Sequence, residues 1–188
     1  MRRLANIDTA NTGDELSTMI KNFAWTTAFA ALLSAPTAAL ALWDVQSSEE
    51  DVFGNINVTA TSIGDNGSIV RFECGTGKDP FVALLIKDNS GDIPAIPAML
   101  LMKAEDGSLV TAVAELSSWN EDYAAIVTSD VIFLDALAEA MLSAKKSIPI
   151  GGEVADVGLK ISDTFSSSGS TAAGAAVKKG CLTGSESN

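Results

Sequence analysis

The chain of 188 residues contains no histidine. Ser-His-Asp hydrolysis, Cys-His chemistry and histidine-ligated zinc all require an imidazole, so the sequence excludes these three classes. Basic residues are also scarce: 12 Lys and Arg stand against 24 Asp and Glu, a formal net charge of −12. Nucleic-acid binding needs Lys and Arg to neutralise phosphates, so we expect no nucleic-acid partner. Apolar residues make up 47% of the chain, which argues against a disordered acidic protein.

An uncharged stretch occupies residues 23–41 and follows Lys21. It ends in the small-residue pattern of Ala39 and Ala41, directly before Leu42. A basic residue, an apolar segment and an A-x-A site in this order are typical of a secretory signal peptide. The segment is short for a membrane span and is diluted by Ala and Thr, so we expect cleavage before Leu42 and no span in the mature chain. The alternatives are an uncleaved N-terminal anchor or a buried helix.

Cleavage at this site would divide the chain into three parts. We expect residues 1–41 to be an N-terminal extension and signal peptide, with Met19 as an alternative start. Residues 42–182 are expected to form a single exported β-rich domain, and residues 183–188 a flexible tail. Residues 1–41 contain as many acidic as basic residues, so the net charge of −12 belongs to the exported part. The sequence thus predicts an acidic periplasmic or secreted protein.

Two cysteines, Cys74 and Cys181, both lie in the exported part. An even number of cysteines in an exported chain indicates a disulfide. In the segment 68–74, Cys74 shares a strand face with Val70 and Phe72, which favours a buried structural cystine over a reactive thiol. A redox-active pair is disfavoured because the chain has no C-x-x-C spacing.

The exported part is dominated by strand patterns with a period of two residues. Asn66-Gly67 and Asp106-Gly107 mark tight hairpin turns, because these residue pairs adopt the positive φ angles that such turns need. Residues 81–86 are continuously apolar, which predicts a strand covered on both faces. The expected strands are 43–47, 55–62, 68–74, 81–86, 99–103, 109–116, 123–128 and 153–161.

Two helices are expected late in the chain. Residues 130–146 carry apolar side chains at helical spacing, with Ser129 or Asp130 as the N-cap. Residues 148–152 should end this helix, and residues 164–170 should form a loop. An Ala-rich helix then covers 171–179 and ends at Gly180. The predicted fold is mainly β with two helices: an antiparallel β-sandwich or a half-open barrel closed by the helices.

The order of several short features resembles a known group of proteins. Trp43 opens the exported part, Cys74 ends a strand, and Trp119 precedes a helix rich in Leu and Ala. A strand, the step from Phe165 to Gly169, an Ala-rich helix and a last cysteine follow. This order, spread over residues 43–182, resembles small exported bacterial proteins of the invasion-associated locus B group and of the type VI secretion-associated TagO family. The resemblance implies a sandwich-like periplasmic or secreted accessory protein that is not an enzyme.

Several clusters offer chemistry, but none is assigned a catalytic, cofactor-binding or metal-binding role. Acid pairs occur at 49–51, 105–106 and 121–122, where turns usually expose them to solvent. Residues 88–92 are similar to the start of a calcium loop, but Met99 occupies the position of the chelating Glu. Serines 166–168, with Lys160 or Lys178, lack the S-x-x-K spacing of a Ser-Lys nucleophile.

Three aromatic residues, Trp43, Trp119 and Tyr123, are candidates for a surface that contacts a partner, with packing as the alternative role. The sequence therefore predicts an exported, disulfide-stapled, non-enzymatic accessory or binding protein of the bacterial envelope, acting on an unidentified protein or envelope component without a cofactor. The alternatives are a periplasmic hydrolase that uses paired carboxylates or Ser-Lys, and a protein inhibitor that adds an edge strand to its target. An exposed apolar patch would favour the first function, and two buried carboxylates in one pocket would favour the hydrolase.

Overall fold

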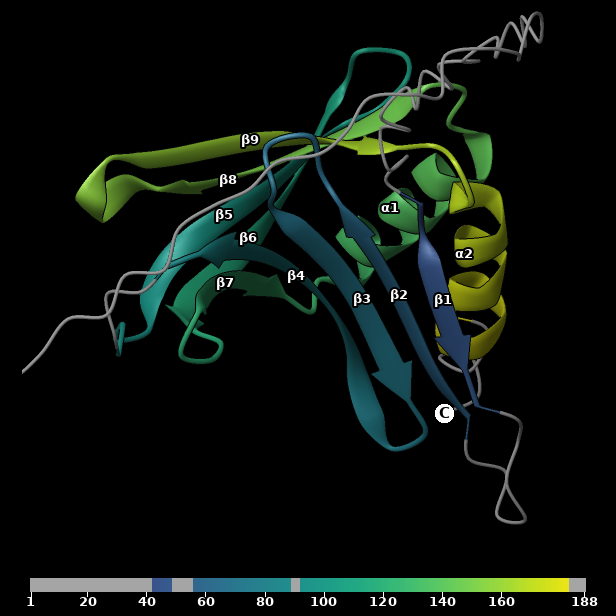
Figure 1. Ribbon diagram of the computed structural model, residues 1–188, viewed down its shortest axis with the longest axis horizontal. Helices are drawn as coiled ribbons and strands as arrows, with labels where there is room; N and C mark the ends of the chain where they lie inside the picture. Colours follow the sequence, from purple (N-terminus) through teal and green to yellow (C-terminus); the bar gives the residue numbers. More distant parts are fainter. Residues whose placement is uncertain (1–41, 49–55, 89–91, 183–188) are drawn as a thin grey trace, which may run out of the picture. The chain divides into compact units, whose positions relative to one another are not determined.

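The computed structural model describes residues 42–48, 56–88 and 92–182. Within these residues, nine strands form one antiparallel sheet in the order β1-β2-β3-β4-β7-β6-β5-β8-β9. The sheet curls into a half-barrel, and two helices pack against it (Figure 1). The strands are β1 (Asp44–Ser47), β2 (Asn57–Ile63), β3 (Ile69–Gly75), β4 (Lys78–Lys87), β5 (Ile96–Lys103), β6 (Leu109–Ser118), β7 (Tyr123–Thr128), β8 (Ser147–Val154) and β9 (Leu159–Ser166). The predicted half-open barrel is confirmed, and no sandwich forms in the described part because its strands belong to a single sheet.

The hairpin signals in the sequence correspond to real turns. Gly67, between β2 and β3, has a φ of +84°, and Gly107, between β5 and β6, has a φ of +86°. Only glycine adopts such angles without steric cost. The strand order nevertheless departs from a simple meander: β4 pairs with β7, while β5 pairs with β6 and β8. The chain must therefore cross from β4 past two neighbouring strand positions before it enters β5.

The largest difference from the sequence prediction lies after the first helix. Residues 148–152, expected only to end the helix, lie in β8, and β9 extends to Ser166 through part of the expected loop. Gly151 and Gly152 are suited to this strand because there is no room for side chains. A Cβ on Gly151 would come 2.6 Å from the carbonyl oxygen of Ile161, and one on Gly152 would come 2.3 Å from Cδ1 of Ile126. The glycines here allow close packing rather than a turn.

The two helices fill the concave side of the sheet. Helix α1 (Val131–Ser143) begins at the predicted cap, where Asp130 Oδ1 accepts hydrogen bonds from the backbone N–H groups of Ile132 (2.9 Å) and Phe133 (3.1 Å). Helix α2 (Ser170–Val177) packs on α1 through Gly174, where an added Cβ would lie 2.9 Å from the Ala138 carbonyl oxygen. Their apolar faces join the inward side chains of the strands in one core, whose large buried members include Phe72, Phe133, Phe165, Leu84, Leu100, Met102 and Ile126.

The predicted disulfide is confirmed and ties the end of the chain to the sheet. Cys74 in β3 is bonded to Cys181, with the Cα atoms 5.6 Å apart. Cys181 lies in a π-helical turn (Lys178–Leu182), so the expected helix end at Gly180 is wrong: that residue lies within the turn. A Cβ on Gly180 would come 2.5 Å from Cγ2 of Val58 in β2. The missing side chain lets the turn approach the sheet closely enough for Cys181 to reach Cys74.

Two polar anchors connect the ends of the curled sheet. Trp43 is 4% exposed. Its indole N–H donates to the carbonyl oxygen of Ser166 (2.7 Å), and its backbone N–H donates to the carbonyl oxygen of Ser168 (3.1 Å). Asp163 in β9 accepts backbone hydrogen bonds from the β2–β3 hairpin, at Asn66 (2.9 Å) and Ser68 (3.0 Å). The end of the chain at β9 is thus joined to the residue before β1 and to the β2–β3 hairpin by side-chain and isolated backbone hydrogen bonds, and not by a ladder.

Candidate functional site on the outer face of the sheet

A group of apolar side chains lies on the convex face of strands β3, β4 and β7. Ala83, Leu85 and Ala125 are buried at its centre, and no residue of either helix belongs to this cluster. The register explains the grouping, because Ile69 lies opposite Leu85 and Leu85 lies opposite Ala125. We call this surface, together with the neighbouring Trp119, the outer patch; its members are Ile69, Phe81, Ala83, Leu85, Trp119, Tyr123, Ala125 and Val127.

A tight turn between β6 and β7 places Trp119 at the border of the outer patch. The backbone N–H of Trp119 donates to the carbonyl oxygen of Tyr123 (2.9 Å). The side chain of Asn120 accepts from the backbone N–H groups of Asp122 and Tyr123, both at 2.9 Å, which fixes the turn. The indole ring then lies 6.1 Å from the ring of Phe81, tilted by 53°. This separation and tilt are typical of a favourable aromatic pair.

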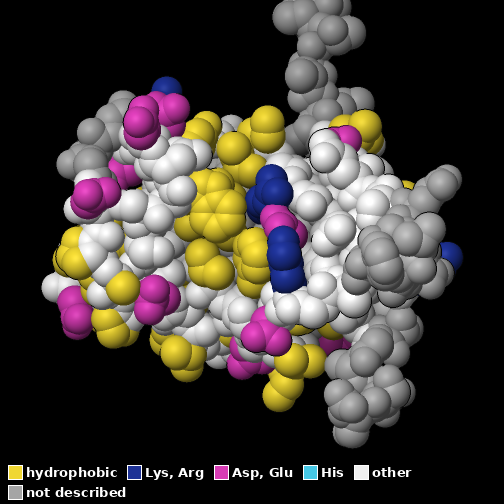
Figure 2. All heavy atoms as spheres, turned by 90° about the horizontal axis from the view of Figure 1, so that it is seen from below, with side chains coloured by type: hydrophobic (Ala, Val, Ile, Leu, Met, Phe, Trp, Pro, Cys, Tyr) yellow, Lys and Arg dark blue, Asp and Glu magenta, His cyan; other side chains and the backbone are white. Residues whose placement is uncertain are grey.

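Charged side chains border the outer patch on two sides. On β3, Arg71 and Glu73 point to the same face and form an ion pair with an N–O distance of 2.7 Å. On β6, the exposed Glu115 lies opposite Val127 of β7. Figure 2 shows hydrophobic side chains gathered on one face of the molecule beside a short row of basic and acidic ones. An apolar centre with a charged border is the usual composition of a protein–protein contact surface.

The continuous apolar run in β4 is buried on both faces at its centre, as expected, because Val82, Ala83, Leu84 and Leu85 are all buried. The cover differs between the two faces: only Val82, Leu84 and Ile86 face the core that contains the helices. Phe81, Ala83 and Leu85 belong to the outer patch. None of these three residues is a site candidate from the sequence alone. The signal was present, since a strand that is apolar on both faces in a single curled sheet must present one apolar face outward.

The structure separates the three aromatic candidates. Trp119, which is 38% exposed, and Tyr123, which is partly buried, lie together in the outer patch. Trp43 does not join them. Its ring is buried in the core because its N–H must reach Ser166 to hold β1 against the end of β9. Packing, and not contact with a partner, is therefore the role that the structure gives to Trp43.

The acid pairs of the sequence lie in solvent-exposed turns where the structure describes them. Both 105–106 and 121–122 are exposed. At Asp106 the hydroxyl and the backbone N–H of Ser108 donate to Oδ1, at 2.6 and 2.9 Å, and these bonds lower the pKa of Asp106. A general acid requires the opposite change, a raised pKa. Among the described residues Asp163 is the one buried carboxylate, and its oxygen atoms bind backbone N–H groups.

The lysines considered for Ser-Lys chemistry are paired with carboxylates. Lys160 forms an ion pair with Glu153 at 2.8 Å. Lys178 in the turn after α2 contacts Glu139 and Asp135 of α1, and the hydrogen bond to Glu139 is the main cause of its raised pKa. A lysine that acts as a general base needs a lowered pKa. These lysines instead stabilise the packing of neighbouring elements.

Some predictions fall on parts of the chain outside the described residues. These are the signal peptide with Ala39 and Ala41, the acid run 49–51, the centre of the calcium-like segment at 89–91 and the tail 183–188. Leu42 is described and is exposed. In the described ranges, no helix is both long and apolar enough to cross a bilayer. The same ranges hold no group of three or more His, Cys, Asp or Glu side chains placed to bind a metal ion.

The outer patch and the Cys74–Cys181 bridge are the two features that a related protein would be expected to share. The expected resemblance to invasion-associated and TagO-like proteins remains a prediction. Comparison of the chain with protein-family models, with characterised proteins and with solved structures finds no match.

Proposed function

We propose that the chain is an exported, disulfide-stapled accessory protein of the bacterial envelope that works by binding, not by catalysis, and that its outer patch contacts a partner protein. The observation that carries the proposal is the apolar outer face of β3, β4 and β7 (Figure 2), where Ile69, Phe81, Tyr123 and Val127 are partly exposed around a buried centre and Trp119 is exposed beside them. Soluble proteins rarely expose such surfaces without a use for them. This face has the aromatic centre and charged border that protein contacts use.

The residues of the outer patch are of the types that contribute most to binding energy. Aromatic side chains dominate interface energetics, and Phe81, Trp119 and Tyr123 lie within one patch. The rigid strands and the fixed turn at Asn120 hold these rings before any partner arrives, which reduces the entropy lost on binding. A net charge of −12 opposes association with an anionic lipid surface and favours a basic protein.

Export is supported by two independent features. The order of Lys21, the uncharged stretch and the Ala39-x-Ala41 site is that of a signal peptide. The disulfide between Cys74 and Cys181 joins residues 107 positions apart, and such bonds form and persist in oxidising compartments. Intact-mass measurement on protein recovered from outside the cytoplasm tests this part. We expect a chain that begins at Leu42 with both thiols oxidised; an unprocessed chain or free thiols would contradict export.

Site-specific photo-crosslinking in cells tests the role of the outer patch. A photoreactive phenylalanine analogue at Tyr123 should give a discrete protein adduct. The control is the same analogue at Val113 in β6. Val113 is 81% exposed and lies on the same face of the sheet as the outer patch but is not a member of it, so this position should not give that adduct. The substitution Trp119→Arg should abolish the Tyr123 adduct and leave the melting temperature nearly unchanged. Identical adducts from both positions, or only lipid adducts from Tyr123, would refute a protein contact at the outer patch.

A further inference from the structure

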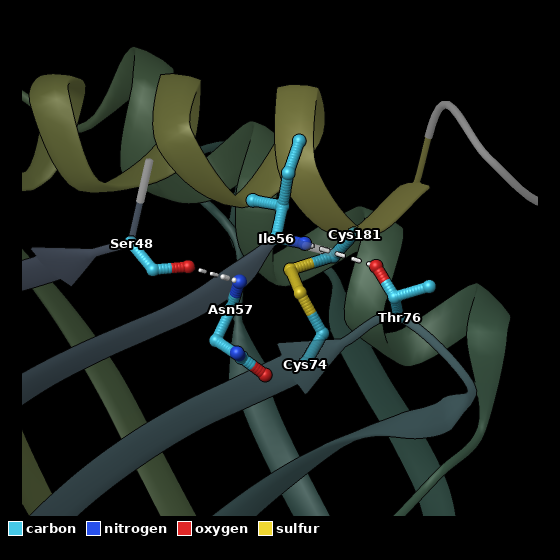
Figure 3. Close-up of a disulfide and its surroundings, with 6 residues drawn as sticks. All are labelled: Ser48, Ile56, Asn57, Cys74, Thr76 and Cys181. Carbon is cyan, nitrogen blue, oxygen red and sulfur yellow. Dashed lines mark hydrogen bonds between the residues drawn. A yellow bond between two sulfur atoms is a disulfide. The ribbon is translucent and has the colours of Figure 1, made fainter. Parts of the chain in front are cut away.

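The backbone of β1 presents unpaired groups along its outer edge. The N–H of Ser48 donates to the carbonyl oxygen of Asn57 (2.9 Å). Ser48 Oγ accepts from the N–H of Asn57 (2.8 Å; Figure 3). Antiparallel ladders alternate, so Gln46, opposite Thr59, also bonds to β2. The N–H and C=O groups of Val45 and Ser47 then point away from β2. The four-residue strand β1 thus offers two backbone N–H donors and two carbonyl acceptors, those of Val45 and Ser47, to an added strand.

The opposite edge of the sheet is blocked. On β9, the outward carbonyl oxygens of Ser162, Thr164 and Ser166 accept hydrogen bonds at 3.3, 3.1 and 2.7 Å. The donors are the Asn66 side chain, the Asp65 backbone and the Trp43 indole, respectively. These contacts leave little of β9 for a further strand. Of the two sheet edges, β1 is therefore the one that can accept an added strand.

A pocket lies beside this edge, between β2 and α2. Its volume is ≈ 400 Å³; Ile56, Val58 and Ala176 supply its apolar lining, and Ser48, Lys179 and Gly180 also line it. Ser47 also lines the pocket, and Ser47 lies opposite Val58 in the ladder, so both side chains face the concave side. In an added strand, the residue opposite Ser47 would point to the same side. Its side chain would enter the pocket.

Charge decides between the candidates for this strand. A second copy of the chain could pair edge to edge, but each copy carries a net charge of −12 and the exposed Asp44 begins β1. We infer that the β1 edge binds an extended, neutral or basic segment of a partner protein as an added strand, with an apolar side chain in the pocket beside α2. This binding mode combines main-chain hydrogen bonds with a side-chain pocket for specificity. It uses a surface separate from the outer patch, so either site can fail a test without the other.

The substitution Ser47→Pro tests the inference without disturbing the sheet. Proline removes an N–H that points away from β2, so the β1–β2 ladder keeps its hydrogen bonds. The matched control is Ser162→Pro on β9, which makes the same chemical change at the other edge of the sheet. Ser162 lies opposite Gly151 of β8 in the ladder. A third variant, Ala176→Leu, fills the pocket and leaves the backbone unchanged. Melting temperatures of the three variants establish that each one folds.

A phage-displayed library of random 12-residue peptides, selected on the full non-reduced chain, serves as the probe. We expect enriched peptides that alternate apolar residues with Lys or Arg. Their affinity should fall at least tenfold for Ser47→Pro and Ala176→Leu, but not for Ser162→Pro. Amide hydrogen exchange should slow at Val45 and Ser47 when peptide binds. The inference is overturned if no peptide is enriched, if Ser47→Pro binds as well as the wild type, or if the β1 edge instead forms a dimer that Ser47→Pro abolishes.

Discussion

Replacement of Asp163 by Ala should open the junction between β9 and the β2–β3 hairpin. The carboxylate is 1% exposed and accepts three backbone hydrogen bonds, from Asn66 (2.9 Å), Ser68 (3.0 Å) and Thr164 (2.7 Å). Alanine leaves these three N–H groups without their acceptor. The N–H of the buried Ser68 cannot readily reach water, while those of Asn66 and Thr164 are closer to solvent. One buried donor and two partly solvated ones cost roughly 2–5 kcal/mol together.

Gly64 supplies a second variant that acts on the same junction. A Cβ on Gly64 would lie 2.5 Å from Cγ of Asp163 and 2.6 Å from Oδ2. The substitution Gly64→Ala should therefore destabilise the wild type by about 1–3 kcal/mol through overpacking. In the Asp163→Ala background the carboxylate is gone, and the same methyl group should cost much less. The two substitutions should be coupled by about 1 kcal/mol or more.

Guanidinium denaturation of the two single variants and the double variant measures this coupling. If the single effects add within about 0.5 kcal/mol, the carboxylate does not occupy the space above Gly64 and the argument is wrong. A pH series adds an independent check. Burial alone would raise the pKa of Asp163, but the bonds from Asn66, Thr164 and Ser68 outweigh it and lower that pKa below the ordinary 3.8. The stability contributed by Asp163 should be present above pH 3.8 and lost as the pH falls through its lower folded pKa, a loss that Asp163→Ala should not show.

Three further predictions concern the core and its bonds. The substitution Cys181→Ser should lower the unfolding free energy by about 4–5 kcal/mol, because the bridge closes a loop of 107 residues, and denaturation with and without reductant should then give the same midpoint. The substitution Gly152→Ala should destabilise the protein by about 1–3 kcal/mol, and Ile126→Val should restore most of this loss in a double variant, because it deletes the Cδ1 atom that lies 2.3 Å from the new methyl group. The substitution Asp130→Ala should cost about 1 kcal/mol in the same denaturation assay, since it removes the acceptor for Ile132 and Phe133 at the start of α1.

Local patterns in the sequence were enough to predict most strands and turns. Hairpin turns depend on a few adjacent residues, and Gly67 and Gly107 have the positive φ angles that their sequence context predicts. The N-cap at Asp130 is equally local. The same local rule failed at Gly151 and Gly152. Glycine is needed at these two positions because Ile161 and Ile126, which lie on other strands, leave no room for a Cβ. A sequence shows that a glycine is present, but only the packed neighbours show whether it serves a turn or a close approach.

The outer patch could be predicted only in part, for a related reason. Trp119 and Tyr123 were candidates as aromatic residues near a strand end, and the structure brings both to one surface. Phe81 and Leu85 were assigned to a doubly covered strand. Alternation within β4 shows which residues share a face, but the number of layers above that face is a property of the whole sheet. One curled sheet with both helices on its concave side leaves the second apolar face of β4 outside the helix-covered core, where Ile69, Phe81, Tyr123 and Val127 pack around the buried Ala83 and Leu85.

Many of the charged groups that could carry chemistry are engaged in structural contacts. Asp163 holds the hairpin, Asp130 caps α1, and Lys178 joins α2 to α1 through Glu139. Arg71, the single arginine after residue 41, is bound to Glu73. In the described part of the chain, an apolar face and a strand edge are not used in this way, and surfaces of these two kinds generally recognise proteins through shape and hydrogen bonding instead of proton transfer. A chain without histidine can perform this kind of recognition, because neither surface needs a group that titrates near neutral pH.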